Sequence, residues 1–219
     1  MKLFPFRIIL PSLILLMVSG CIERVVQKNE LPVYGSKEIL VKGEDGLDKL
    51  DTITLKIDSF QVMDQDSQIV TAADFKNKIY VVDFFFTHCP TICPIMTKNM
   101  SKVYDEFKTD DEIMFLSHTI DIKNDSVPQL KKYASKIGIT SQKWHMVTAD
   151  KMVIYNLAEQ YMVSAEEDPN SPGGYMHSGA FILMDGQHRI RGYYDGTLEE
   201  DTEQMIADIK VLKKESNER

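Results

Sequence analysis

The chain of 219 residues has little of what several protein classes require. Its three cysteines are too few for a disulfide scaffold. Lys and Arg number 25 against 33 Asp and Glu, a net charge of −8, so no basic surface for nucleic acid is expected. A composition of 43% hydrophobic and 26% charged residues excludes collagen, coiled coils and disordered chains. The length suits one domain with an appendage.

The apolar run near the amino terminus is also short. Residues 8–18 follow Lys2 and Arg7, and about eleven apolar residues cannot cross a hydrocarbon core of about 30 Å as a helix. The run has the size of a signal-peptide core, and small residues follow it. Ser19-Gly20-Cys21 resembles the bacterial lipobox, in which the cysteine becomes the acylated first residue. The alternative is an ordinary signal peptide with an incidental Cys21.

These features predict three regions. Residues 1–20 are a signal peptide, residues 21–50 a lipidated amino terminus and tether, and residues 51–219 the folded domain. Several acyl chains on one residue give stable anchoring that a single chain does not. We therefore expect the protein on the extracytoplasmic face of a bacterial membrane, which is the periplasmic side if there are two membranes. That compartment is oxidising, so the pair Cys89 and Cys93 must be considered as thiols exposed to oxidising conditions.

Hydrophobic periodicity in the third region predicts alternating strands and helices. Short strands are expected at 53–57, 60–63 and 68–71, and a strand buried on both faces at 78–86. Helical spacing follows at 92–107, then a strand at 112–120, a helix at 126–137, a strand at 144–148 and a helix from Asp150 to about Tyr161. After a Pro/Gly/Ser loop, strands 180–184 and 189–194 form a hairpin, and a helix covers 199–214.

This order predicts an α/β fold with a mixed central sheet, helices on both faces and an N-terminal β-hairpin. It is the thioredoxin-like arrangement with an extra helix inserted.

Cys89 and Cys93 form a C-x3-C motif between the buried strand and the first long helix. Unpaired N–H groups and the positive end of the helix dipole lower thiol pKa values there, so both sulfurs are expected to gain thiolate character. One turn of chain brings them within reach of each other, as a redox-active pair, or of one metal ion. Pro94 fits the first helical turn.

A third ligand candidate is His177, in a glycine-rich loop before strand 180–184. In a thioredoxin-like sheet this loop faces the start of the first long helix. Thioredoxins typically place a proline here, whereas Pro169 and Pro172 lie several residues upstream. Two thiolates and one imidazole suit copper as Cu(I), while structural zinc requires four ligands.

Five segments in order resemble the Sco/SenC family: Phe84-Phe-Phe-Thr-His-Cys-Pro-Thr-Ile-Cys-Pro94, Thr119-Ile-Asp121, Tyr155-Asn-Leu-Ala158, His177-Ser-Gly179 and Ile190-Arg-Gly-Tyr-Tyr-Asp-Gly196. The resemblance spans nearly the whole mature domain. It implies a thioredoxin-like fold, membrane attachment, and copper, Cu(I) or Cu(II), bound by Cys89, Cys93 and His177. The implied role is a metallochaperone that matures the binuclear copper centre of cytochrome c oxidase. Its partners would be the copper-binding oxidase subunit or another copper chaperone.

Other residues keep two interpretations. His88 is either an auxiliary ligand or a solvated loop histidine, and Asp121 either orders the site or caps a turn. Asp83 is either a polar core residue or a proton-handling group. Met96 and Met176 flank the ligands and either assist copper transfer or fill space.

Two other functions compete with the chaperone. A thiol–disulfide oxidoreductase acting on partner cysteines is compatible with the cysteine pair, although the extra residue in C-x3-C and the missing proline argue against a general one. A peroxiredoxin is disfavoured, because Phe86 and Pro90 stand where a threonine would precede the reactive cysteine by three residues.

Overall fold

The computed structural model describes residues 30–43, 46–140 and 142–218. Its strands are β1 (Ser36–Lys42), β2 (Asp48–Thr54), β3 (Gln61–Asp64), β4 (Ile69–Thr71), β5 (Ile79–Phe85), β6 (Ile113–Thr119), β7 (Trp144–Thr148), β8 (Ala165–Glu167), β9 (Tyr175–His177), β10 (Ala180–Met184) and β11 (Ile190–Asp195). Its helices are α1 (Cys93–Phe107), α2 (Val127–Ile137), α3 (Lys151–Gln160) and α4 (Glu199–Asn217), with a short 3-10 helix at Ala72–Phe75. The expected signal peptide and Cys21 lie outside the described residues. Within the described residues, no helix is both long and apolar enough to cross a bilayer.

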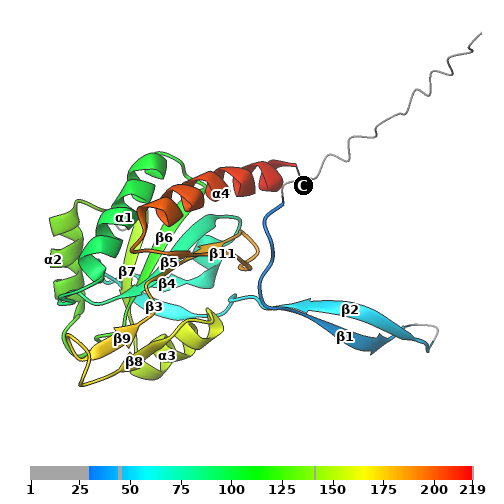
Figure 1. Cartoon of the computed structure of the whole chain (residues 1–219), viewed down its shortest axis with the longest axis horizontal. Coiled ribbons are helices and arrows are strands. Elements are labelled where there is room, and N and C mark those ends of the chain that lie inside the picture. The colour runs from blue at the N-terminus through cyan, green and yellow to red at the C-terminus, as the bar shows by residue number, and fades with distance from the viewer. Residues whose placement is uncertain (1–29, 44–45, 141, 219) are drawn as a thin grey trace, which may run out of the picture.

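In the described residues, seven strands form a mixed sheet in the order β11-β10-β5-β6-β7-β3-β4. β5, β6 and β7 run parallel, and the flanking pairs are antiparallel. Figure 1 shows α1 and α4 above this sheet and α3 below it. Every residue of β5 is buried, as its continuous apolar sequence predicts for a central strand. The predicted mixed sheet with helices on both faces is confirmed.

Helix α1 positions the C-x3-C motif, because its apolar stripe fixes the rotation of the helix against the sheet. Met96, Met100, Val103 and Phe107 recur at helical spacing and are all buried. Pro94 occupies the first turn, where a missing N–H costs nothing. The helix therefore begins at Cys93 and holds that residue against the end of β5.

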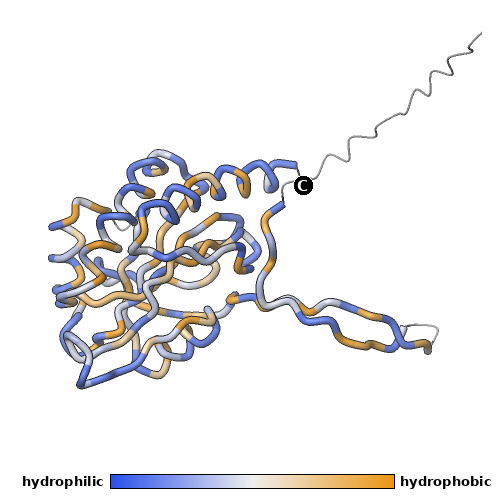
Figure 2. The backbone as a smooth tube through the Cα atoms, in the orientation of Figure 1, coloured by the Kyte–Doolittle hydropathy of each residue, from blue (hydrophilic) through white to orange (hydrophobic). Residues whose placement is uncertain are grey.

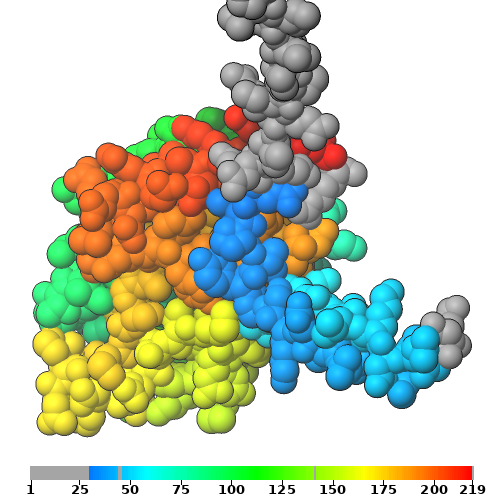
Figure 3. Space-filling model, turned by 45° about the vertical axis from the view of Figure 1, so that its right-hand side comes forward, coloured from blue at the N-terminus to red at the C-terminus, as the bar shows by residue number. Residues whose placement is uncertain are grey.

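The amino-terminal region differs from the sequence prediction. β1 and β2 pair as an antiparallel hairpin, where a tether was expected up to residue 50. We call the two strands and the described residues between them the hairpin arm (residues 36–43 and 46–54). The strand expected at 53–57 is wrong in its bounds, because β2 ends at Thr54. The arm stands clear of the body and exposes both faces (Figures 1 and 3). Because neither face packs on the core, its strands do not need alternating apolar and polar residues, and the sequence has no lasting alternation there. The predicted N-terminal β-hairpin is confirmed, and the strands expected at 60–63 and 68–71 are present as β3 and β4, which pair with each other.

Residues 30–35, which we call the N-terminal strap, are fastened to the body by a buried arginine. The Arg191 side chain is 2% exposed and donates to the backbone carbonyls of Leu31 (2.6 Å) and Pro32 (3.0 Å). It also bonds the carboxylates of Asp185 (3.2 Å) and Glu215 (2.7 Å). One guanidinium thus joins the strap, the β10–β11 turn and the end of α4.

We expect Arg191→Ala to lower the free energy of unfolding by about 3 kcal/mol or more, because the buried Glu215 carboxylate loses its arginine. The control is Lys102→Ala, whose exposed pair with Glu199 should be worth about 0–1 kcal/mol. Urea unfolding of both variants gives the comparison. Equal losses would show that the buried cluster adds nothing beyond a surface pair.

Candidate metal centre

Cys89 and Cys93 lie where β5 passes into α1. The backbone N–H of Cys89 donates to the carbonyl of Phe86 (3.3 Å), which turns the chain after the strand, and Cys93 is the first residue of the helix. Both cysteines are free thiols. Cys93 is 2% exposed and Cys89 is 9% exposed, so the sulfur in the loop is the more accessible one.

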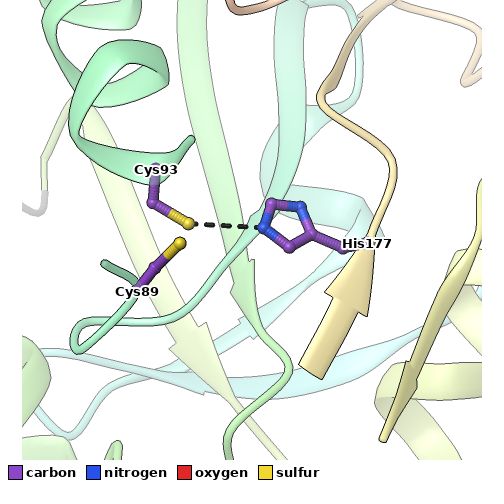
Figure 4. Close-up of side chains that lie close together, drawn as sticks. All are labelled: Cys89, Cys93 and His177. Carbon is purple, nitrogen blue, oxygen red and sulfur yellow. Dashed lines mark hydrogen bonds between the residues drawn. The ribbon is translucent and has the colours of Figure 1, made fainter. Parts of the chain in front are cut away.

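His177 meets the cysteines from the other side. Its Nε2 lies 3.3 Å from the sulfur of Cys93, although the two residues are 84 positions apart in the sequence. One ligand atom from each of Cys89, Cys93 and His177 lies within 4.8 Å of the other two, and Figure 4 shows all three converging. The described chain therefore contains two sulfurs and one imidazole nitrogen arranged around a common point.

The expectation that His177 sits in a glycine-rich loop is wrong. The residue ends β9, which pairs with β8 in a small antiparallel hairpin, and His177 itself is paired with Ala165. Strands of three residues joined by a Pro- and Gly-containing turn carry too little periodicity to be recognised in sequence. The imidazole is therefore held on paired backbone.

A single hydrogen bond determines the tautomer of His177. Its Nδ1 lies 3.0 Å from the carbonyl oxygen of Ser178, which only accepts, so Nδ1 carries the proton. Burial lowers the pKa of His177, and the bond to Ser178 opposes this only in part. The ring is neutral at pH 7, and its Nε2 lone pair points at the sulfur of Cys93. This is the form of histidine that binds a metal.

The two thiols differ in acidity, and the expectation that both gain thiolate character is wrong for Cys93. Burial and a hydrogen bond to Cys89 raise the pKa of the Cys93 thiol far above its usual value. Burial on its own would raise the pKa of Cys89 as well. Hydrogen bonds from the Cys93 thiol and from the backbone N–H groups of Thr91 and Cys93 outweigh this effect, and the pKa of Cys89 is lowered. Cys89 is the more reactive thiol.

Aromatic rings and a glycine close the site. Phe86 packs edge-on to His177 with ring centroids 5.9 Å apart and lies 5.3 Å from the ring of Tyr175. Gly173 has φ +84°, and a Cβ there would lie 2.7 Å from the Phe86 ring and 3.2 Å from Pro90. A cavity of about 160 Å³ remains beside Cys89, Met176 and His177. Small ligands can reach Cys89 through it.

Asp125 holds the cysteine loop and was not recognised in the sequence. Its fully buried carboxylate accepts from the Thr87 N–H (2.9 Å), the Thr87 hydroxyl (2.5 Å) and the Thr119 hydroxyl (2.6 Å). Gln129 also donates to the Thr87 oxygen (3.0 Å). No local pattern distinguishes Asp125 from the neighbouring turn residues, because its partner lies 38 positions earlier.

Asp121 has contacts that fit both interpretations given to it. It accepts from the Tyr175 hydroxyl (2.9 Å), which ties it to the strand bearing His177. It also accepts from the backbone and side chain of Asn124, as a turn residue does. With His88 and Asp125 it forms a second group of ligand-type side chains within 4.8 Å of one another. The hydrogen bonds from Thr87, Thr119, Asn124 and Tyr175 already engage the carboxylates of this group.

The other candidate histidines lie away from the sulfurs. His88 is exposed and contacts the Thr87 hydroxyl (3.0 Å), outside the group formed by the cysteines and His177. His145 contacts Asp64 (3.1 Å), and His188 contacts the Tyr80 hydroxyl (3.3 Å). His118 is buried against Phe84 without a hydrogen-bond partner. Each of these four therefore has a position that does not involve the sulfurs.

The two methionines that flank the ligands differ in exposure. Met96 is buried in the core at 1% exposure. Met176 is 44% exposed beside the cavity, where a thioether could meet an incoming soft metal.

Comparison with known proteins points to one family. The family model described as SCO1/SenC matches residues 51–214. A SCO1/SenC family lipoprotein from Bacillus anthracis is 28% identical, with 72% of this chain and 95% of that chain covered and a TM-score of 0.66. BsSco, described as having a disulfide switch and as a member of the Sco family of cytochrome c oxidase assembly proteins, is 25% identical over 72% of this chain and 92% of its own, with a TM-score of 0.63.

ScoI from Bradyrhizobium japonicum, solved with copper bound, is 26% identical over 70% of this chain and 97% of its own, with a TM-score of 0.59. The predicted thioredoxin-like fold is confirmed by these likenesses. The family match begins within β2, so β1 lies outside it.

Asp83, for which the sequence left two interpretations open, lies in the middle of β5. The residue is 6% exposed, and its carboxyl group accepts a hydrogen bond from the Ser117 hydroxyl, whose oxygen accepts from the Trp144 indole (2.7 Å). Burial raises the pKa of Asp83 to about 7, although the Ser117 bond lowers it. The residue is thus a polar core group that can change protonation state near neutral pH.

We expect Asp83→Asn to remove a pH dependence of stability. The carboxyl ionises near pH 4 in the unfolded chain and near 7 in the folded protein, so stability falls as pH rises between these values. At pH 8 the variant should be more stable than wild type by up to about 4 kcal/mol, and at pH 4 the two should be alike. Urea unfolding across this range measures the difference, and parallel curves would refute the assignment.

Proposed function

The chain belongs to the SCO1/SenC family, and on that premise we propose that it is a copper metallochaperone that assists assembly of the binuclear copper centre of cytochrome c oxidase. The observation that carries the proposal is the convergence of two thiols and the Nε2 lone pair of His177 within 4.8 Å. The copper-bound ScoI and the oxidase assembly role of BsSco support it by analogy.

The donor set suits copper better than other metals. Thiolates are soft ligands that favour Cu(I), and an imidazole is a good ligand for either copper oxidation state. Structural zinc requires four ligands, and the described group offers three. Three ligands also leave a copper ion open to attack by a receiving protein. Copper is therefore the cargo of the site, held by Cys89, Cys93 and His177.

Loading copper requires the loss of thiol protons. The Cys89 proton leaves first, since its pKa is lowered, and the buried Cys93 thiol gives up its proton only when the metal takes its place. His177 needs no deprotonation at Nε2, because the Ser178 carbonyl already holds the proton on Nδ1. Copper affinity should accordingly rise with pH.

A second function, thiol–disulfide exchange, is favoured by the unequal acidity of the two thiols. The accessible thiolate of Cys89 can attack a partner disulfide to form a mixed disulfide and release one partner thiolate. The Cys93 sulfur, once deprotonated, then attacks Cys89 and releases the second partner thiolate. The chain ends with a Cys89–Cys93 disulfide, and the partner has gained two electrons.

We also propose that Cys21 carries the lipid anchor and that the domain works on the extracytoplasmic face of a bacterial membrane. The support is the Ser19-Gly20-Cys21 sequence after a short apolar run, and the lipoprotein nature of the Bacillus anthracis relative. In that position the partners would be the copper-binding oxidase subunit or another copper chaperone.

We expect His177→Ala to lower copper affinity by at least about tenfold, since even the loss of a group that merely orients a ligand costs 10–100-fold. The fold should persist, with one cooperative thermal transition. The matched control is His88→Ala, because His88 adjoins Cys89 in sequence but contacts Thr87 instead. Anaerobic Cu(I) competition titrations measure both. Wild-type affinity and oxidase maturation in the His177 variant would show that the histidine is structural.

We expect a limiting amount of iodoacetamide to label Cys89 at least about ten times faster than Cys93 at pH 7, because the thiolate is the nucleophile. Peptide mass spectrometry at early times gives the two rates. Unfolding in urea is the control and should bring them together. Similar rates in the folded protein would exclude the proposed division between an attacking and a resolving thiol.

A further inference from the structure

The hairpin arm carries a large share of the exposed apolar surface. Leu40, Leu47, Leu50 and Ile53 are 70%, 68%, 63% and 56% exposed. Leu40 and Leu50 are direct cross-strand partners, so their side chains share one face of the arm. Figure 2 shows apolar colour along the arm, away from the body. A two-stranded sheet with uncovered leucines is marginal in water and is expected to be covered in its working state.

The base of the arm is fixed at one end of the body. On the amino-terminal side of the arm, the backbone N–H of Tyr34 donates to the carbonyl of Ile190 (2.9 Å). On its carboxyl-terminal side, the backbone N–H of Ile57 donates to the carbonyl of His188 (3.0 Å). The neighbouring β10–β11 turn also bonds Asn77, just before the start of β5. The cysteines follow the other end of β5. The arm and the metal centre therefore lie at opposite ends of a strand roughly 20 Å long.

The strap, with which the described part of the chain begins, is fastened near the same end. Leu31 donates to Glu215 near the end of α4, and the strap leads from there to the arm (Figures 1 and 3). Eight residues lie between Cys21 and Glu30, so the chain from one to the other spans at most about 30 Å. Each strand of the arm has seven residues, about 23 Å. The arm is long enough to reach a bilayer that holds the acyl chains of Cys21.

We propose that the hairpin arm rests in the interface of that bilayer through Leu40, Leu47 and Leu50, and thereby turns the metal centre away from the membrane. The proposal rests on the lipid anchor proposed above. Strands β1 and β2 carry three lysines and three carboxylates, so they offer no charge complementarity to a basic or acidic protein. The lysines can keep their ammonium groups in water beside buried leucines.

The test uses a tryptophan as a depth probe. The single native tryptophan, Trp144, is 1% exposed in the core and gives a constant background. Leu50→Trp is introduced into the acylated full-length protein, which is reconstituted in phosphatidylcholine vesicles with or without brominated acyl chains. The matched control is Met152→Trp, at a residue 68% exposed on α3. We expect a blue shift and a loss of emission in brominated vesicles for Leu50→Trp, and neither for Met152→Trp.

A second variant pair tests the energetics without the probe. In the wild type, vesicles should slow hydrogen exchange at the backbone amides of the arm. The double variant Leu40→Asp with Leu50→Asp should lose this slowing. Absence of quenching at Leu50→Trp overturns the proposal, whether the arm is then found cross-linked to a second copy or to an oxidase subunit. Absence of lipid on Cys21 by mass spectrometry overturns it as well. Copper stoichiometry measured on the same samples reports separately on the chaperone function.

Discussion

The bond from His177 Nδ1 to the Ser178 carbonyl determines what chemistry the centre can perform. With the proton held on Nδ1, the other nitrogen presents a lone pair to the sulfurs at all pH values where the ring is neutral. The opposite tautomer would present an N–H and repel a cation. Pairing of β9 with β8 keeps the ring in place, and the contact between Tyr175 and Asp121 ties the same strand to the loop after β6. Strand pairing and hydrogen bonds thus connect the loop after β6, the β8–β9 hairpin and the cysteines to one another.

The unequal thiols connect the two functions. Burial raises the pKa of Cys93 while hydrogen bonds lower that of Cys89, so the two sulfurs give up their protons in a fixed order, whether the incoming partner is a metal or a disulfide. The same asymmetry provides one attacking and one resolving thiol. Metal binding and disulfide exchange then use the same atoms and exclude each other at any moment, because a sulfur bonded to sulfur cannot bind copper as a thiolate.

Much of the fold, and the meeting of Cys89, Cys93 and His177, could be predicted from the sequence, because most of these features depend on local patterns. The apolar run of β5, the helical spacing of α1 and the C-x3-C motif all lie within a few residues of one another. His177 could be placed opposite the cysteines because the order of elements predicts the sheet topology. The acidity of Cys93 could not be predicted, since it depends on burial by residues far away in sequence. Asp125 was missed for the same reason, and the hairpin arm because exposed strands need no apolar alternation.

Gly173 affects how variants of this gene should be judged from their sequences. Its missing side chain lets the β8–β9 turn lie against Phe86 and Pro90, and any Cβ would force that contact apart. A substitution at this position would leave Cys89, Cys93 and His177 in the sequence while straining the turn that packs against the cysteine loop. Such an allele would keep every motif and still disturb the packing that closes the site, so the presence of Cys89, Cys93 and His177 is not by itself evidence that a variant gene encodes an intact centre.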